Sequence, residues 1–199
     1  MLKFRHAICP IILMLSACNN NNHTPSRAPD DTTAPATTSN PTNATSPGTA
    51  TSSNTKTIIF FGNSLTAGYG LNSDQSFPTL IGNRLDSLHL PWKVINAGIS
   101  GDTSAGILSR IGSAVPEGTR IVILSVFAYN DNRKGISPAE HQANVAAIER
   151  QLRSRGIRII NANGLIQSAL KAGMVQGDGI HLTAEGCRRV AMGLLGSVR

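Results

Sequence analysis

Two short segments carry side chains whose types and spacing could perform nucleophilic catalysis. Ser64 follows Gly62 at the end of an apolar run, where small neighbouring residues let a substrate approach the backbone. A free serine hydroxyl is a weak nucleophile at neutral pH and needs a base. Asp178 stands three residues before His181, so its carboxylate can accept a hydrogen bond from one imidazole nitrogen while the other takes the Ser64 proton.

These segments belong to a set of four that resembles the sequence blocks of the SGNH (GDSL) hydrolase family. The four occur in the family's order along the folded part of the chain, at residues 61–70, 96–103, 128–131 and 178–181. Two positions depart from the family's pattern. Asn63 stands where the first block usually has Asp, and Ala128 stands where the third has Gly. If position 128 required a positive φ or very close packing, Ala128 would add strain there and misplace its neighbour Asn130.

The resemblance implies a role for each matching residue. Ser64 would be the nucleophile, His181 the general base and Asp178 its orienting partner. The oxyanion hole would consist of the backbone N–H groups of Ser64 and Gly101 and the side-chain amide of Asn130. Such donors stabilise a tetrahedral intermediate, each by about 2.7–4 kcal/mol. No His-Glu-x-x-His motif, paired cysteines or clustered carboxylates occur, so we expect no metal and no cofactor.

The first block is most similar to the thioesterase, lysophospholipase and arylesterase branch of the family, which implies a small-molecule or lipid-like ester as substrate. An O-acetyl ester of a cell-wall or exported polysaccharide is an alternative that the same site could hydrolyse. A third interpretation is a non-catalytic relative that binds its ligand without turnover. Only Asn63 and Ala128 favour this interpretation. The presence of Ser64, Asp178 and His181 speaks against it, because a binding protein has no need of proton-transfer residues.

The elements that must position these residues alternate between short apolar runs and helical stretches. We expect strands at 57–61, 92–95, 120–126 and 157–160, and helices at 77–88, 104–111, 138–153 and 183–195. Ser137 and Thr183 are the expected N-caps of the last two helices. This order predicts an α/β fold: a three-layer α/β/α sandwich with a flavodoxin-like parallel sheet of four to five strands. Ligands of such sheets bind beyond the carboxyl ends of the strands, where the polar blocks fall.

The chain opens with features of a bacterial lipoprotein. Residues 1–17 have two positive charges and a short apolar run, too short for a membrane span of about 20 residues, and Leu15–Cys18 resembles a lipobox. That resemblance implies cleavage before Cys18 and lipidation of its thiol. Residues 18–55 are rich in Asn, Thr, Ser and Pro and read as a disordered tether, which leaves 56–199 as the catalytic domain. We expect a lipid-anchored protein of the cell envelope, with the outer membrane favoured because Asn19, not Asp, follows the cysteine.

The remaining composition gives fewer indications. Residues 56–199 hold 15 Lys and Arg against 9 Asp and Glu, a net charge of +6, but no nucleic-acid-binding motif accompanies them. We interpret this excess as a solvated face and expect no nucleic-acid partner. Cys187 has no partner for a disulfide within the domain and is predicted to be a small buried residue. His89 and His141 show no partner spacing and are predicted to lie on the surface. The oligomeric state stays open.

Overall fold

The computed structural model describes residues 55–198. The predicted signal segment, the lipidation site Cys18 and the tether as far as residue 54 lie outside the described residues. Among residues 55–198, no helix combines the length and the apolar character needed to cross a membrane.

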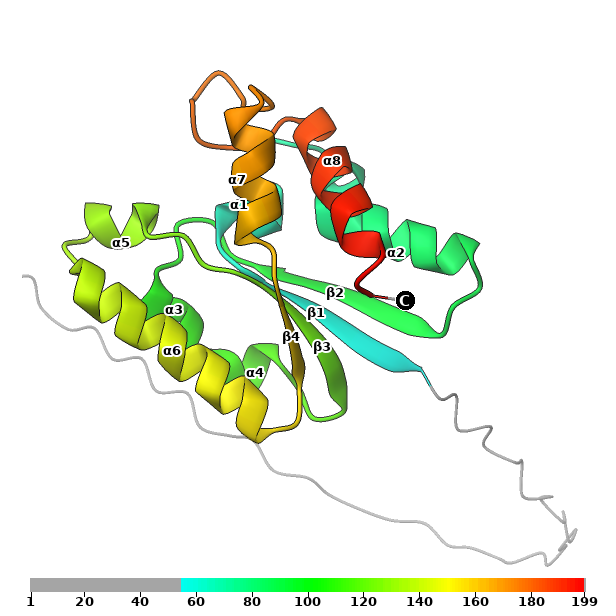
Figure 1. Cartoon of the computed structure of the whole chain (residues 1–199), viewed down its shortest axis with the longest axis horizontal. Coiled ribbons are helices and arrows are strands. Elements are labelled where there is room, and N and C mark those ends of the chain that lie inside the picture. Colours follow the sequence, from blue (N-terminus) through cyan, green and yellow to red (C-terminus); the bar gives the residue numbers. More distant parts are fainter. Residues whose placement is uncertain (1–54, 199) are drawn as a thin grey trace, which may run out of the picture. The chain divides into compact units, whose positions relative to one another are not determined.

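A four-stranded parallel sheet forms the centre of the fold (Figure 1). Its strands are β1 (Lys56–Gly62), β2 (Trp92–Gly98), β3 (Thr119–Ser125) and β4 (Arg158–Asn161), in the spatial order β2-β1-β3-β4. The predicted α/β class and flavodoxin-like strand order are confirmed. Of the four to five strands predicted, residues 55–198 form four. Gly62 is level with Gly98 of β2 and with Ser125 of β3, so three strands end together at one edge of the sheet.

Helices cover both faces of the sheet (Figure 1). They bury alternate residues of each central strand on opposite faces. Ile58 and Phe60 of β1 pack into one core, together with α2 (Phe77–Ser87), α7 (Asn163–Lys171) and α8 (Ala184–Leu195). Ile59 and Phe61 face the opposite core, which α3 (Ser104–Ser109), α4 (Ile111–Ala114) and α6 (Pro138–Ser154) complete. All four β1 side chains are fully buried. Burial of each stabilises the fold by about 1.5–3 kcal/mol, so β1 is firmly anchored for presenting the residues after it.

The longer helices begin where a hydroxyl can cap them. Ser76 accepts from the backbone N–H of Thr79 at the start of α2. Ser137 accepts from Glu140 in α6, and Thr183 accepts from Gly186 in α8, as predicted for both. Each such cap satisfies a backbone donor that the helix itself leaves free, which typically contributes about 1 kcal/mol.

The sequence pattern did not predict every element. It missed the short helices α1 (Ser64–Ala67) and α5 (Tyr129–Arg133), the helix α7 and the 3-10 turn η1 (Ser73–Gln75). Helices of four or five residues are too short to show an apolar period. The helix predicted over 104–111 is in fact two, α3 and α4, which meet at Arg110.

Candidate active site

The predicted site residues follow three neighbouring strands at the edge where these strands end together. Ser64 comes two residues after β1, Gly101 three residues after β2, and Asn130 five residues after β3. From β1 the chain continues to β2 on one side and then to β3 on the other, so the strand order changes direction between β1 and β3. Parallel sheets bind ligands at such a switch point.

Ser64 is the first residue of α1, held against the sheet by two glycines. A Cβ atom at Gly62 would collide with the carbonyl oxygen of Ser125, and one at Gly98 would collide with the backbone nitrogen of Ala67. Glycine at both positions therefore lets α1 sit directly on the strand ends. The Ser64 side chain is partly exposed, so its hydroxyl remains accessible at the top of the sheet.

The structure brings His181 and Asp178 to Ser64 from a loop 117 residues away along the chain. The Nδ1 atom of His181 lies 2.6 Å from Oδ2 of Asp178, and its Nε2 atom lies 2.9 Å from Oγ of Ser64. An Nδ1–H that donates to the carboxylate leaves Nε2 as the acceptor for the serine hydroxyl. This is the arrangement in which an imidazole can remove the proton of an attacking serine.

The loop that carries this pair is fixed by backbone and amide hydrogen bonds. Val175 and Leu182 form an antiparallel bridge, and the backbone N–H of Gln176 donates to the His181 carbonyl at 2.7 Å. The Gln176 amide donates to the carbonyls of Tyr69 and Leu182, both at 2.8 Å, so it ties the loop to the segment after α1. The Tyr69 ring packs against the His181 ring with centroids 4.5 Å apart. These contacts leave the imidazole little freedom to turn away from Ser64.

The environment of Asp178 favours its ionised form. The side chain of His181 and the backbone N–H groups of His181 and Ile180 all donate to its carboxylate, at 2.6, 3.0 and 2.9 Å. These hydrogen bonds lower the pKa of Asp178 from its ordinary value of 3.8 to about 2. The carboxylate therefore stays charged at neutral pH and can stabilise an imidazolium on His181.

The two predicted oxyanion-hole residues after β2 and β3 line the same depression as Ser64 and His181, about 190 Å³ in volume. Gly101 has φ +78°, a left-handed conformation that favours glycine. One N–H of the Asn130 side-chain amide donates to the Asp102 carbonyl at 2.9 Å, which leaves its second N–H available to a ligand. Another depression, about 520 Å³ in volume, lies over α2 and β2 and contains neither Ser64 nor His181.

Arg110 is a residue of this region to which the sequence analysis gave no role. Its guanidinium donates to the carboxylate of Asp102 at 2.7 Å and to the carbonyls of Ala97 and Gly62 at 2.8 and 2.9 Å. It also lies over the Phe61 ring, 4.5 Å from the centroid. Arg110 thus joins the ends of β1 and β2 to the loop that holds Gly101. The contacts of Arg110 lie in other elements of the fold, so spacing alone gives no signal for this role.

His141 does not lie free on the surface, and that prediction was wrong. Its Nδ1 atom lies 2.6 Å from Oδ2 of Asp131, whose side chain is fully buried. Oδ1 of Asp131 accepts from the backbone N–H of Ser104 at 2.8 Å, and the Asn144 amide donates to the Ser104 hydroxyl at 3.0 Å. The pair therefore connects α5, which carries Asn130, to α3 and α6. A spacing of 10 residues between Asp131 and His141 spans two elements, so no local pattern reveals it.

The two departures from the family pattern prove compatible with the site. Ala128 has φ −73° and ψ −3°, an ordinary right-handed conformation that any residue adopts, so it adds no strain before Asn130. Asn63 is buried, and its amide donates to the Phe127 carbonyl at 3.4 Å. An ionised Asp has no proton to donate to that carbonyl, whereas the Asn63 amide has one. The buried Oδ1 atom of Asn63 has no hydrogen-bond partner among residues 55–198.

The other sequence predictions concern residues away from Ser64. Cys187 is fully buried in α8, as predicted, and burial raises the pKa of its thiol. His89 is exposed, as predicted. Among residues 55–198, no three His, Cys, Asp or Glu side chains gather in a way that could hold a metal ion.

Comparison with known proteins places this site in a family. Residues 60–177 match the GDSL-like Lipase/Acylhydrolase family, a match that ends immediately before Asp178. Over 105 residues the chain is 32% identical to Esterase TesA of Pseudomonas aeruginosa, and the matched region covers 53% of this chain and 52% of that protein. Over 103 residues it is 27% identical to an Arylesterase of Vibrio mimicus, covering 52% of each. The chain thus spans about half the length of the curated relatives it matches.

Solved structures share the fold over a longer range. A crystal structure of TesA superimposes with a TM-score of 0.65 at 24% identity, covering 72% of this chain and 98% of that one. AlinE4, an SGNH-hydrolase family esterase, superimposes with a TM-score of 0.51 at 28% identity, covering 72% of this chain and 95% of that one. With the family match extending over more than half of its residues, the chain belongs to the GDSL-like lipase/acylhydrolase family.

Proposed function

We propose that this protein is a serine ester hydrolase that works through an acyl-enzyme on Ser64. The observation that carries the proposal is the continuous chain of hydrogen bonds from Ser64 through His181 to Asp178, at 2.9 and 2.6 Å. A non-catalytic relative has no need of this chain, and a wide separation of Ser64 from His181 would have favoured one. The names of the relatives, an esterase and an arylesterase, support the same class of reaction.

In the first half of the reaction, Ser64 Oγ attacks the carbonyl carbon of the ester while His181 Nε2 takes the hydroxyl proton. The carbonyl oxygen becomes an oxyanion, for which the backbone N–H groups of Ser64 and Gly101 and the free N–H of the Asn130 amide are the proposed donors. When the intermediate collapses, the ester C–O bond breaks, and His181 gives its proton to the departing alkoxide. Ser64 is then left as an acyl ester.

The second half regenerates the enzyme with water as the nucleophile. His181 removes a proton from the water while its oxygen attacks the acyl carbon, and the same donors hold the new oxyanion. Collapse releases the carboxylic acid and returns the proton to Ser64. Asp178 keeps the imidazole in its orientation and stabilises the imidazolium of both steps, because its lowered pKa keeps the carboxylate charged.

Small or lipid-like acyl esters are the proposed substrate class. Tyr69 and Tyr129, 54% and 45% exposed, line the depression that holds Ser64 and offer apolar contact at its mouth. The depression measures only about 190 Å³, a volume that suits a short acyl group. For this reason, an O-acetyl ester of a polysaccharide is a second candidate.

The function is tested with p-nitrophenyl esters from acetyl to long acyl chains, using the full chain with and without Ser64→Ala. The proposal expects turnover by the wild type that vanishes in the variant, and the preferred chain length separates acetyl from lipid-like substrates. Turnover that survives Ser64→Ala would exclude the serine mechanism. A folded wild-type protein that hydrolyses none of these esters and no acetylated polysaccharide would favour a ligand-binding role.

We also propose that Cys18 carries lipid and holds the protein at the bacterial cell envelope, with the outer membrane favoured. The Leu15–Cys18 segment and the polar residues after it support this proposal. Mass spectrometry of the mature amino terminus is the direct test. Cys18→Ser should move the protein from the membrane fraction to the soluble fraction of the envelope, and an unchanged distribution would contradict the proposal.

A further inference from the structure

A second depression adjoins the one that holds Ser64. Its volume is about 380 Å³, and its lining consists of Gly101, Asn130, Arg133 and Lys134. Gly101, Asn130 and Arg133 also line the depression around Ser64 and His181, so the two spaces share a wall. A substrate held with its carbonyl at the proposed oxyanion donors therefore has room for a substituent beside Arg133 and Lys134.

The second depression is positively charged, and no carboxylate in the described part of the chain pairs with its cations. Within residues 55–198, neither Arg133 nor Lys134 forms an ion pair with a carboxylate. The aspartates of this region bind other groups: Asp102 pairs with Arg110, and buried Asp131 pairs with His141. Both cations are exposed and reachable from solvent.

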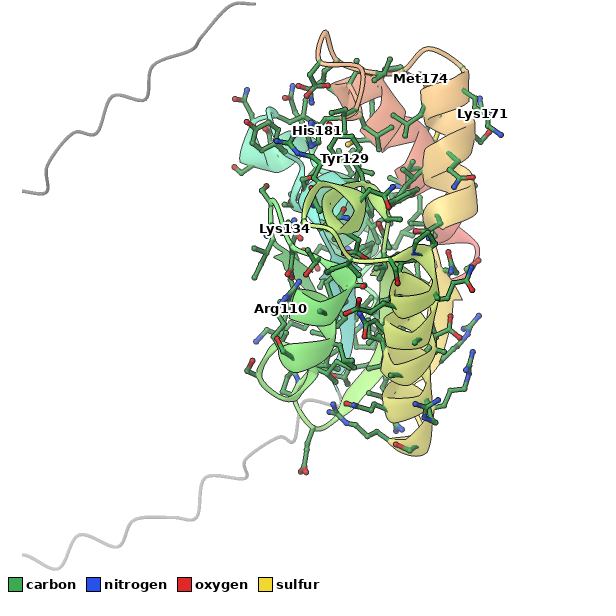
Figure 2. All side chains as sticks on the ribbon, turned by 90° about the vertical axis from the view of Figure 1, so that its left-hand side faces the viewer. Arg110, Tyr129, Lys134, Lys171, Met174 and His181 are labelled. Carbon is green, nitrogen blue, oxygen red and sulfur yellow. The ribbon has the colours of Figure 1, made fainter. Side chains whose placement is uncertain are left out.

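Contacts with the site hold the two cations beside it rather than leaving them free. The Lys134 ammonium donates to the Gly101 carbonyl at 3.1 Å, which leaves two of its N–H groups available. The Arg133 guanidinium lies over the Tyr129 ring, 5.8 Å from the centroid, and its five N–H donors suit a planar anion. Tyr129, Lys134 and His181 appear on the same side of the molecule in Figure 2, whereas Lys171 of α7 lies apart from them.

We propose that Arg133 and Lys134 form a subsite for an anionic substituent of the ester substrate, a carboxylate or a phosphate. The proposal rests on the proposed function and specifies its substrate as an ester that bears a negative charge near the scissile bond. The charge has two sources, a carboxylate on the acyl side or a phosphate on the alcohol side. Exposed cations act through solvent, so each contributes about a two- to fivefold preference, weakened by salt.

Turnover of matched ester pairs tests the subsite. On the acyl side, 4-nitrophenyl hydrogen succinate is compared with neutral 4-nitrophenyl pentanoate. On the alcohol side, 1-butyrylglycerol 3-phosphate is compared with 1-butyrylglycerol. In at least one pair, the ratio of kcat/KM for the anionic ester to that for the neutral ester should fall about two- to fivefold in Arg133→Gln and further in Arg133→Glu. Arg189→Gln, at an exposed position on α8, is the matched control and should leave the ratio unchanged.

The neutral ester in each pair reports any general damage to the site, so the ratio isolates the effect of charge. The pair that responds identifies the source of the anion. Ratios that stay equal in the wild type, Arg133→Gln and Arg133→Glu for both pairs would overturn the proposal.

A binding measurement separates failure of the subsite from failure of the proposed function. Ser64→Ala protein is titrated with monomethyl succinate, glycerol 3-phosphate and neutral dimethyl succinate, and the backbone amide signals are followed by NMR. The subsite predicts shifts at Gly101, Arg133 and Lys134 with an anionic probe only, lost in Ser64→Ala/Arg133→Glu. If these shifts occur but the wild type hydrolyses no ester, the esterase proposal fails and the anion site stands. If the wild type hydrolyses esters but shows neither the shifts nor the change in ratio, the anion site fails and the esterase proposal stands.

Discussion

Two aspartate–histidine pairs in this protein have the same bond and different surroundings. In both, the histidine Nδ1 atom lies 2.6 Å from the aspartate Oδ2 atom. The Asp178 side chain is 38% exposed, and the second nitrogen of His181 contacts the Ser64 hydroxyl. The Asp131 side chain is fully buried, and its other oxygen accepts a backbone N–H of α3.

The comparison shows that the bond itself does not define a catalytic dyad. What distinguishes the first pair is a hydroxyl at the outer imidazole nitrogen and an opening to solvent through which a substrate can enter. The second pair joins three helices, one of which carries Asn130. These contacts suit a role in holding that helix, and with it Asn130, in place. Substitutions at matching positions of the two pairs should therefore affect different measurements.

The largest expected difference follows from removing each imidazole. His181→Ala deletes the proposed base and should lower kcat by about four to six orders of magnitude while the melting temperature stays near that of the wild type. His141→Ala should lower kcat less than about tenfold and reduce stability by about 1.5–3 kcal/mol, because the buried carboxylate loses a donor. Ester hydrolysis and thermal unfolding of both variants check this. Comparable losses of kcat would show that the second pair acts in catalysis.

Removing each carboxylate should again reduce stability mainly at the second pair, and by more than removing its imidazole does. Asp131→Ala leaves the Ser104 N–H and the His141 ring without their buried acceptor, and we expect a loss of about 3 kcal/mol or more, roughly 10 °C in Tm. Asp178→Ala removes an exposed carboxylate and should lower kcat strongly with a far smaller change in Tm. If Asp131→Ala melts at the wild-type temperature, the second pair does not support the fold.

The sequence predicted the first pair and not the second, for a physical reason. Asp178 and His181 are three residues apart in one loop, so a local motif contains their chemistry. Asp131 and His141 meet only because α5 and α6 turn back on each other, and Arg110 reaches Gly62 only once the sheet has formed. The strands and the capped helices α6 and α8 were predictable from apolar runs and hydroxyl caps. The short α1 and α5, which present Ser64 and Asn130, depend on tertiary contacts.

Acid should weaken both pairs, through carboxyls whose folded-state pKa values lie below the ordinary 3.8. Burial raises the pKa of Asp131, but hydrogen bonds from Ser104 and His141 outweigh it and lower the pKa overall, while hydrogen bonds lower that of Asp178 to about 2. A depressed folded-state pKa stabilises the fold fully above the unfolded value, and this contribution is lost as the pH falls through the folded value. The wild-type Tm should therefore fall between about pH 4 and pH 2.

Asp131→Asn provides the control for this acid transition. Its amide does not titrate, so its Tm should fall less than that of the wild type over the same pH range, and the two proteins should converge in acid. Thermal unfolding at half-unit pH steps measures the difference. Parallel curves would mean that Asp131 does not contribute to the acid transition.

The smallest expected effect concerns Ala128, which precedes α5 and its Asp131. Since Ala128 has an ordinary right-handed conformation, Ala128→Gly restores the usual family residue without relieving strain. We expect kcat to change less than twofold and stability to fall by about 0.5–1 kcal/mol, because glycine has more freedom to lose on folding. A marked rise in kcat would show that Ala128 restrains Asn130.

The direction of β1 determines how the protein could be immobilised on a solid support. The strand enters the sheet at Lys56 and ends at Gly62, at the edge that holds Ser64 (Figure 1). At the usual rise per residue, these two ends lie roughly 20 Å apart. Any linkage made through the backbone ahead of Lys56 is thus attached at the end of the sheet remote from Ser64. Immobilisation through that side leaves the proposed active site open to the surrounding medium, whereas a linkage through Lys134 would obstruct it.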